Sequence, residues 1–216
     1  MSAYSDRAFP LKKIAFSAYL CYYDYMQITS AKFVKGIIGT DDVLANWFPQ
    51  IAFIGRSNVG KSSVINALTN QKGLAISSSF PGRTREINIF LVNESLYLLD
   101  LPGYGFAKAY KELREQLFKL IDWYLFKSPY QQKKVVLIID ANVGPTDKDL
   151  EMLAALEEFN KEIVIVANKI DKIKKSKYAG QLQEIEKLFS RHKVIPFSSY
   201  SKIGLDDLAS EILIGG

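Results

Sequence analysis

Residues 55–62 read Gly55-Arg56-Ser57-Asn58-Val59-Gly60-Lys61-Ser62, and Ser63 follows them. This is the G-x-x-x-x-G-K-[ST] pattern of a phosphate-binding loop, and it comes directly after the apolar run 51–54. A strand that leads through such a loop into a helix directs successive backbone N–H groups and a helix N-terminus toward one point, which makes an anion site. The stretch therefore predicts that residues 55–63 bind a nucleoside triphosphate.

Apolar runs of strand length alternate with helical patterns along the chain. The runs lie at 51–54, 87–92, 96–101, 135–140, 163–167 and 194–197, and the helical patterns at 62–68, 112–126, 146–159, 178–189 and 205–212. This alternation predicts an α/β fold with a six-stranded, mostly parallel sheet and helices on both faces. Because residues 93–95 leave no room for a crossover helix, the second and third runs must form a hairpin, so one strand is antiparallel.

The bulk composition is that of a soluble globular protein. Of 216 residues, 48% are hydrophobic and 24% are charged, and Cys21 is the single cysteine. An intrachain disulfide is therefore impossible, and we expect a reducing compartment, the cytoplasm. Apolar runs stay short of the roughly 20 residues of a spanning helix, so we expect no integral membrane association. The net charge of +5 mildly favours a polyanionic partner such as nucleic acid.

Residues 1–25 differ from the rest of the chain. Lys12 and Lys13 precede the apolar stretch 14–21, as in a signal peptide, but tyrosines follow and a small-residue cleavage site is missing. Met26 opens the first segment with a clear pattern. We therefore expect residues 1–25 to be a weakly ordered extension or a misread start, and residues 26–216 to form one domain.

A second pattern, D-x-x-G, comes at the end of an apolar strand, with Asp100 and Gly103 at its fixed positions. A carboxylate at this place holds Mg²⁺, usually through water, and a glycine lets bare backbone approach a γ-phosphate. Ser62 would then be the direct Mg²⁺ ligand, and Lys61 would neutralise the β- and γ-phosphate oxygens.

The longest irregular connection, residues 70–86, is rich in Ser, Gly and Pro and contains Pro81-Gly82-Arg83-Thr84. Long loops of this kind in compact domains are usually functional. Thr84 is the expected second hydroxyl on Mg²⁺, and Gly82 belongs to the same nucleotide-binding stretch. Such a ligand ties the order of the loop to the γ-phosphate, so hydrolysis would release it.

The nucleotide base is predicted to bind farther along the chain. Asn168-Lys169-Ile170-Asp171 gives N-K-x-D at the carboxyl end of a strand, where ligands of open α/β sheets bind. Asp171 can accept hydrogen bonds from N1–H and the exocyclic amine of guanine, whereas adenine has neither donor there, so the site selects GTP over ATP. After the next strand, a backbone N–H of Ser198 or Ser199 is expected to reach guanine O6.

The order and spacing of these patterns resemble the translation-factor-like branch of P-loop GTPases. More narrowly, the residues at 55–63, 81–84, 100–105 and 197–199 are similar to those of the EngB (YihA/YsxC) family of bacterial ribosome-assembly GTPases. The resemblance covers residues 26 to about 214. The family often has Thr at the position of Asn168, but Asn is the common residue in GTPases generally, so guanine recognition is not affected.

The resemblance implies a Ras-like P-loop GTPase domain that binds and hydrolyses GTP as a switch. It implies a role in assembly of the large ribosomal subunit, with a link to cell division. The partners would be the precursor of that subunit and its ribosomal RNA, and no obligate protein partner is evident. A candidate RNA contact is the lysine-rich stretch with Lys172, Lys174, Lys175 and Lys177. Alternatively, these lysines are only the solvated start of a helix.

Catalysis is expected to be slow without help. Ras-type enzymes place a glutamine directly after D-x-x-G to orient the attacking water, but this chain has Tyr104 there. Asn58 matches a position at which related GTPases support a K⁺ ion, which could supply the missing positive charge. The side chain of Arg56 is expected either to reach RNA or nucleotide or to pair with a carboxylate. The predicted catalytic residues are Lys61, Thr84, Gly103 and Asn58.

Two other functions share the nucleotide-binding patterns. A GTPase switch in tRNA modification, or in a membrane or cytoskeletal process, generally needs an added domain or a long hydrophobic element, and neither is visible in the sequence. A nucleotide-sensing module with negligible hydrolysis is the second alternative. GTP-dependent co-sedimentation with large ribosomal subunits would separate the first from ribosome assembly, and single-turnover hydrolysis would exclude the second.

Overall fold

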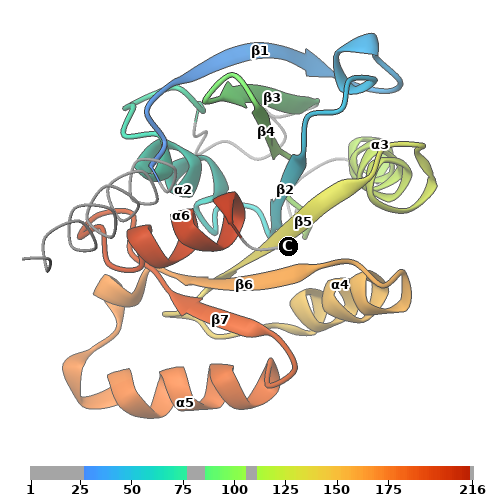
Figure 1. Cartoon of the computed structure of the whole chain (residues 1–216). Coiled ribbons are helices and arrows are strands. Elements are labelled where there is room, and N and C mark those ends of the chain that lie inside the picture. Colours follow the sequence, from blue (N-terminus) through green and yellow to red (C-terminus); the bar gives the residue numbers. More distant parts are fainter. Residues whose placement is uncertain (1–26, 77–85, 106–110, 215–216) are drawn as a thin grey trace, which may run out of the picture.

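The computed structural model describes residues 27–76, 86–105 and 111–214, and these ranges form a twisted sheet flanked by helices (Figure 1). Within them the sheet has seven strands in the order β1-β3-β4-β2-β5-β6-β7. The strands are β1 Ala31–Ile37, β2 Gln50–Gly55, β3 Ile87–Val92, β4 Leu96–Asp100, β5 Gln132–Asp140, β6 Ile163–Asn168 and β7 Lys193–Pro196.

The strand directions confirm the α/β prediction. Strand β3 pairs antiparallel with β1 and with β4, and the other pairs in the sheet, β2 with β4 and β5, β5 with β6, and β6 with β7, are parallel. The prediction of six strands was wrong, because it missed β1. In this edge strand only Ile37 is buried, and the register shifts between Phe33 and Lys35. Lysines and bulges are usual protection for a sheet edge, and they hide the apolar pattern that marks inner strands.

Five helices and several single turns connect the strands in the described residues. The helices are α2 Lys61–Leu68, α3 Lys111–Asp122, α4 Asp147–Glu158, α5 Tyr178–Leu188 and α6 Leu205–Leu213. The turns are η1 Asp42–Leu44, η2 Trp123–Lys127, η3 Ile170–Lys172 and η4 Lys175–Lys177, and η2 continues α3 as a π-helical turn.

Two hydrophobic layers hold the helices on the sheet. Ile51 and Phe53 of β2 pack into the layer under α2 and α6, whereas Ala52 and Ile54 pack into the layer under α3, α4 and α5. All four side chains are fully buried. Because successive residues of a strand point to opposite faces, a strand covered on both faces needs the continuous apolar run that the sequence shows. The prediction of helices on both faces is thus confirmed.

The parallel strands bring the predicted site residues to one edge of the sheet. In the strand register, Phe53 of β2 lies beside Asp100, and Asp140 of β5 lies beside Asn168. The carboxyl ends of β2, β4, β5, β6 and β7 therefore meet at the same edge, which is where open α/β sheets bind their ligands.

Some predictions concern residues outside the described ranges. These are the proposed extension 1–25 with Cys21, and the loop residues Gly82 and Thr84. The boundary between residues 25 and 26 stays a prediction for the same reason.

Candidate functional site

The phosphate-binding loop runs from the end of β2 at Gly55 to the start of α2 at Lys61. Gly60 has a φ of +100°, and a Cβ atom there would lie 2.5 Å from Asn168 Nδ2, so glycine is required both by the backbone and by the space. Helix α2 has no side-chain cap at its N-terminus. Its first N–H groups are therefore available to an anion such as a phosphate.

A buried carboxylate lies beside the loop. Asp100 is 2% exposed, and its Oδ2 accepts a hydrogen bond from Ser62 Oγ over 2.7 Å. Its Oδ1 is buried without a hydrogen-bond partner among the described residues. Burial raises the pKa of Asp100, against the lowering effects of the Lys61 charge and the Ser62 hydrogen bond, and burial lowers the pKa of Lys61.

The Ser62 hydroxyl oxygen and Asp100 Oδ1 together suit a hard cation. A hydroxyl and an unpartnered carboxylate oxygen are the ligands that Mg²⁺ takes from a protein when phosphates and water supply the rest. The described ranges contain no group of three or more His, Cys, Asp or Glu side chains placed to hold a metal. Among the described residues, Ser62 and Asp100 would therefore supply two oxygen ligands, and a bound phosphate would supply others. Thr84, the third predicted ligand, lies outside the described residues.

The D-x-x-G segment lies directly against the phosphate-binding loop. The Ser57 N–H donates to the Tyr104 carbonyl oxygen over 2.9 Å, and the Tyr104 N–H donates to the Gly55 carbonyl oxygen over 3.3 Å. A Cβ atom on Gly103 would lie 2.9 Å from the backbone of Ser57, so a larger residue would push the two segments apart. The structure thus brings Gly103 to the loop, as the sequence predicts.

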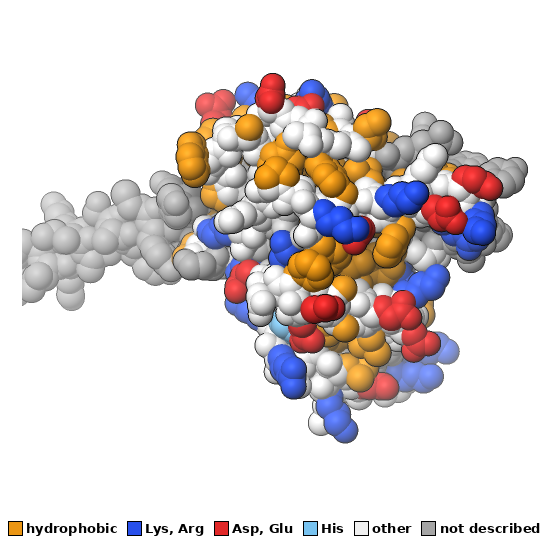
Figure 2. Space-filling model, turned by 90° about the vertical axis from the view of Figure 1, so that its right-hand side faces the viewer, with side chains coloured by type: hydrophobic (Ala, Val, Ile, Leu, Met, Phe, Trp, Pro, Cys, Tyr) orange, Lys and Arg blue, Asp and Glu red, His pale blue; other side chains and the backbone are white. Residues whose placement is uncertain are grey.

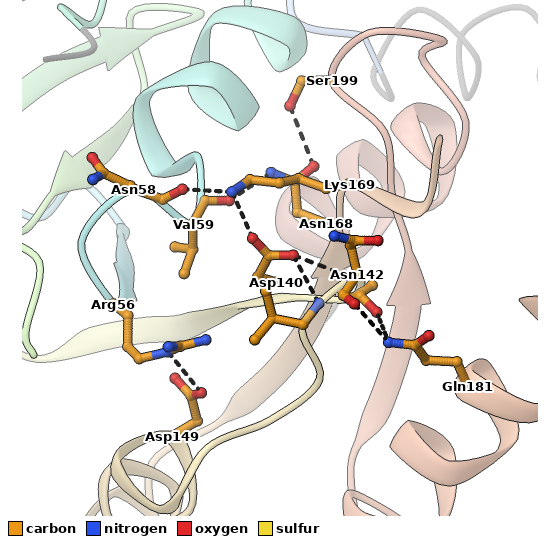
Figure 3. A network of polar contacts seen from close by, with 12 residues as sticks. Arg56, Asn58, Val59, Asp140, Asn142, Asp149, Asn168, Lys169, Gln181 and Ser199 are labelled. Atoms are coloured by element: carbon orange, nitrogen blue, oxygen red, sulfur yellow. Dashed lines mark hydrogen bonds and ion pairs between the residues drawn. The ribbon is translucent and has the colours of Figure 1, made fainter. Parts of the chain in front are cut away.

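The N-K-x-D segment is tied to the same loop from the other side (Figure 3). Asn168 is 2% exposed, and its Nδ2 donates to the Val59 carbonyl oxygen over 2.8 Å. Lys169 Nζ donates to the Asn58 carbonyl oxygen over 2.6 Å. These two side chains therefore connect the base end of the site to the phosphate end, and they fix the shape of the loop between Asn58 and Gly60.

The predicted base-recognition residues come together at the end of β6 and β7. Ser198 is fully buried, and its Oγ donates to Asp171 Oδ1 over 2.7 Å. The Ser198 N–H donates to the Ile203 carbonyl oxygen, which leaves the N–H of Ser199 as the predicted donor to guanine O6. Ser199 Oγ lies 3.5 Å from Asn168 Oδ1. Ser198 therefore orients Asp171 through its hydroxyl instead of contacting the base through its backbone.

Two further carboxylates, which the sequence patterns did not single out, support the site. Asp140, at the end of β5, pairs with Lys169 Nζ over 2.6 Å and accepts the Asn142 N–H over 3.0 Å (Figure 3). Asp149, in the first turn of α4, lies 3.0 Å from Arg56 Nε. Asp140 could have been found, because polar residues at the carboxyl ends of buried parallel strands gather at one edge. Asp149 could not, because in the sequence it reads only as part of the Thr-x-x-Asp cap of a helix.

Of the two roles expected for Arg56, pairing with a carboxylate is observed. Asp149 is fully buried and also accepts the Tyr104 hydroxyl over 2.8 Å. Burial, and then the Asp149 carboxylate, raise the pKa of Tyr104, so the phenol stays protonated and donates. The Tyr104 hydroxyl is thus directed at Asp149.

Comparisons with known proteins agree with this geometry. Residues 50–169 match the family model described as "50S ribosome-binding GTPase", and residues 127–214 match the "Elongation factor Tu GTP binding domain". The chain is 41% identical over 187 residues to the probable GTP-binding protein EngB of Acholeplasma laidlawii, covering 86% of this chain and 97% of the relative. It is 42% identical over 191 residues to the corresponding protein of Clostridium perfringens, covering 85% and 94%.

Solved structures give the same result. A crystal structure of a probable GTP-binding protein EngB matches with a TM-score of 0.62 at 26% identity, covering 76% of this chain and 96% of that one. Era in complex with MgGDPNP and nucleotides 1506–1542 of 16S ribosomal RNA also matches with a TM-score of 0.62 at 26% identity, covering 77% and 56%. In the part of the chain that the structure describes, every helix is too short or too polar to cross a bilayer. This chain therefore belongs to the EngB family of GTP-binding proteins, and it is a P-loop enzyme that hydrolyses GTP.

Proposed function

We propose that this GTPase is a switch that assists assembly of the large ribosomal subunit in the cytoplasm. The proposal is supported by the family model, whose description names 50S ribosome binding, and by a basic strip beside the base site. The strip consists of the exposed side chains Lys172, Lys174, Lys175 and Lys177. A link to cell division, which the resemblance also implies, stays a prediction.

The basic strip is the observation that carries the proposal. Lys172 lies on η3, Lys174 lies between η3 and η4, and Lys175 and Lys177 lie on η4. None of these four lysines forms an ion pair with a carboxylate in the described ranges. By contrast, Lys35 and Lys127 are paired. The face around α3 and α4 also differs, because positive and negative side chains are interspersed there (Figure 2). A row of unpaired positive charges is the usual footprint of a phosphate backbone.

The first prediction tests this partner by co-sedimentation. With a non-hydrolysable GTP analogue the wild-type chain is expected to pellet with large ribosomal subunits, and with GDP it is expected to stay largely in the supernatant. Changing the four lysines of the strip to glutamine should weaken pelleting by about tenfold or more, because fewer counterions are then released from RNA. The matched control changes four other exposed lysines to glutamine, at positions Lys72, Lys111, Lys119 and Lys187.

The control variant carries the same net charge, so it should pellet like the wild type. Equal pelleting with GTP analogue and GDP, or no pelleting with either, would contradict the ribosomal role. Equal losses in both lysine variants would show a general charge effect and would remove the basic strip as the contact.

We further propose that the bound metal is Mg²⁺, held by Ser62 and Asp100 with Thr84 as the additional hydroxyl. The unpartnered Oδ1 of Asp100 supports this assignment, as does the MgGDPNP named for the matching Era structure. Bound there, Mg²⁺ would neutralise charge on the β- and γ-phosphate oxygens. Lys61 adds a positive charge from the loop, and Gly103 offers its N–H to the γ-phosphate. Asp171 fixes the base, so that the triphosphate lies along the start of α2.

Potassium dependence is the second prediction. Asn58 is exposed, has a φ of +66°, and turns its side chain away from Lys169 (Figure 3). We propose that this side chain helps to hold a K⁺ ion that compensates for the missing water-orienting glutamine. Single-turnover hydrolysis should then be at least about tenfold faster in K⁺ than in Na⁺, since K⁺ would act in the place of an arginine finger, which is worth about 10³- to 10⁵-fold.

The matched variant is Asn58→Gly, because glycine keeps the left-handed backbone without the amide. It is expected to hydrolyse GTP at the Na⁺ rate in both salts. Equal wild-type rates in K⁺ and Na⁺, with and without ribosomal subunits, would refute the K⁺ role.

A further inference from the structure

One buried carboxylate connects three separate segments of the site. Asp149 Oδ2 lies 3.0 Å from Arg56 Nε of the phosphate-binding loop, in an ion pair without hydrogen-bond geometry. Its Oδ1 accepts the Tyr104 hydroxyl over 2.8 Å. Its Oδ2 also accepts the backbone N–H and the hydroxyl of Thr146, each over 2.9 Å, which caps α4. The phosphate-binding loop, the segment after Gly103 and the N-terminus of α4 thus share one charged group.

Tyr104 is held at both ends. Its backbone is hydrogen bonded to Gly55 and Ser57, and its side chain ends on Asp149. A groove of about 370 Å³ opens beside the ring, with Leu117 and Phe118 of α3 on the other side. Among the described residues, this groove leaves one side of the ring open. The ring packs against the hydrophobic core on one side, and the hydroxyl contact with Asp149 fixes its outer end.

We propose that Tyr104 is a positioning residue that holds Gly103 at the γ-phosphate end of the loop and, through Asp149, couples that position to the N-terminus of α4. Gly103 directly precedes Tyr104, so its N–H moves with the Tyr104 backbone. The Arg56 side chain, 3.0 Å from Asp149 Oδ2, holds the carboxylate toward the loop. A nucleotide that binds the Gly103 N–H then tightens the Tyr104 contact and stabilises the first turn of α4.

The coupling distinguishes GTP from GDP. Only a γ-phosphate reaches the position that Gly103 faces, so a loss at Tyr104 should weaken the binding of GTP and leave that of GDP unchanged. A side chain that only stabilised the fold would weaken both nucleotides equally or neither. The ratio of the two dissociation constants therefore separates a positioning role from a structural one.

The third prediction uses Tyr104→Phe, which removes one hydroxyl and keeps the ring. Titration calorimetry with GDP and with β,γ-imido-GTP, in Mg²⁺ and without ribosomes, is expected to show about five- to tenfold weaker binding of the GTP analogue and GDP binding within about twofold of wild type. A hydrogen bond to a charged group is worth enough for such a change. The single-turnover rate should fall with it.

The matched control is Tyr124→Phe. Tyr124 is fully buried, and its hydroxyl donates to Gln50 Oε1 over 2.9 Å at the opposite end of β2 from the loop. This variant loses the same hydroxyl from a buried tyrosine, although its partner is a neutral amide oxygen instead of a carboxylate, so its melting temperature should fall. Both nucleotides should bind it within about twofold of wild type.

Hydrogen exchange gives an independent readout. In the wild type, the N–H groups of Asp149 and Leu150, which donate to the Thr146 carbonyl oxygen, should exchange more slowly with the GTP analogue than with GDP. This difference should vanish in Tyr104→Phe and in Arg56→Gln, a variant of a partly exposed side chain that provides the test if Tyr104→Phe does not fold.

Three results would each overturn the proposal. The affinities for GDP and for the GTP analogue could change equally, Tyr104→Phe could bind both nucleotides as Tyr124→Phe does, or the hydrogen exchange of α4 could be the same with both nucleotides. Because ribosomes are absent from these measurements, their outcome is independent of the proposed partner.

Discussion

Changing Asp171 to asparagine is expected to weaken the binding of GDP and of GTP analogues by about a thousand-fold, the largest effect of any single change at the base end of the site. The carboxylate can accept two charge-assisted hydrogen bonds from guanine, each worth about 1.5–3 kcal/mol. The Ser198 hydroxyl, 2.7 Å from Asp171 Oδ1, would keep hold of the amide oxygen. The amide NH₂ group would then face the two donors of the base.

The same geometry predicts a gain with another base. Xanthine has a carbonyl where guanine has its exocyclic amine, so the new NH₂ group can donate to it, and Asp171→Asn should prefer xanthosine diphosphate to GDP. Asp206→Asn is the matched control, because Asp206 is an exposed acid in the first turn of α6 and should leave both affinities unchanged. Unaltered GDP binding by Asp171→Asn in calorimetry would remove Asp171 from base recognition.

Changing Lys61 to alanine is expected to reduce the affinity for GTP by about a thousand-fold. The hydrolysis rate at saturating nucleotide should fall by about 10²- to 10³-fold. Two unit charges about 4 Å apart attract by about 4 kcal/mol at an effective dielectric constant of about 20. The buried Asp100 makes the loss larger, because without Lys61 its negative charge opposes the phosphates. Single-turnover hydrolysis and calorimetry with β,γ-imido-GTP measure the two effects.

Lys187→Ala provides the control for Lys61→Ala. Lys187 is exposed on α5 and takes no part in the site, so both the rate and the affinity should stay at wild-type values. Thermal melting in the absence of nucleotide checks that Lys61→Ala is folded. A folded Lys61→Ala chain that hydrolyses GTP within about tenfold of the wild-type rate would show that the loop lysine does not stabilise the transferred phosphate.

The inner part of the fold could be predicted because its strands are buried on both faces. β2, β5 and β6 read as continuous apolar runs, and the short connection at 93–95 fixed the direction of β3. The edge strand β1 lacks that signal, since its solvated side chains include Lys32 and Lys35 and its register shifts after Phe33. Its pairing with β3 depends on backbone hydrogen bonds, which do not leave a hydrophobic pattern in the sequence.

The site could be predicted where chemistry demands a fixed residue at a fixed spacing, as at Lys61, Asp100 and Asp171. Supporting contacts between distant segments could not be predicted in the same way. Asp149 is 93 positions from Arg56 in numbering, and only the packing of α4 against the loop brings them to 3.0 Å. The redirection of Ser198 toward Asp171 has the same origin, since its N–H is taken by Ile203.

Titration calorimetry of the full chain with guanine and adenine nucleotides in Mg²⁺ tests the central claim most directly. The loop between β2 and α2 should bind the phosphates while Asp171 selects the base, so one GDP or β,γ-imido-GTP should bind per chain. ADP and β,γ-imido-ATP should bind at least about 10⁴-fold more weakly. Absence of heat with both guanine nucleotides, or equal binding of the adenine nucleotides, would contradict the account.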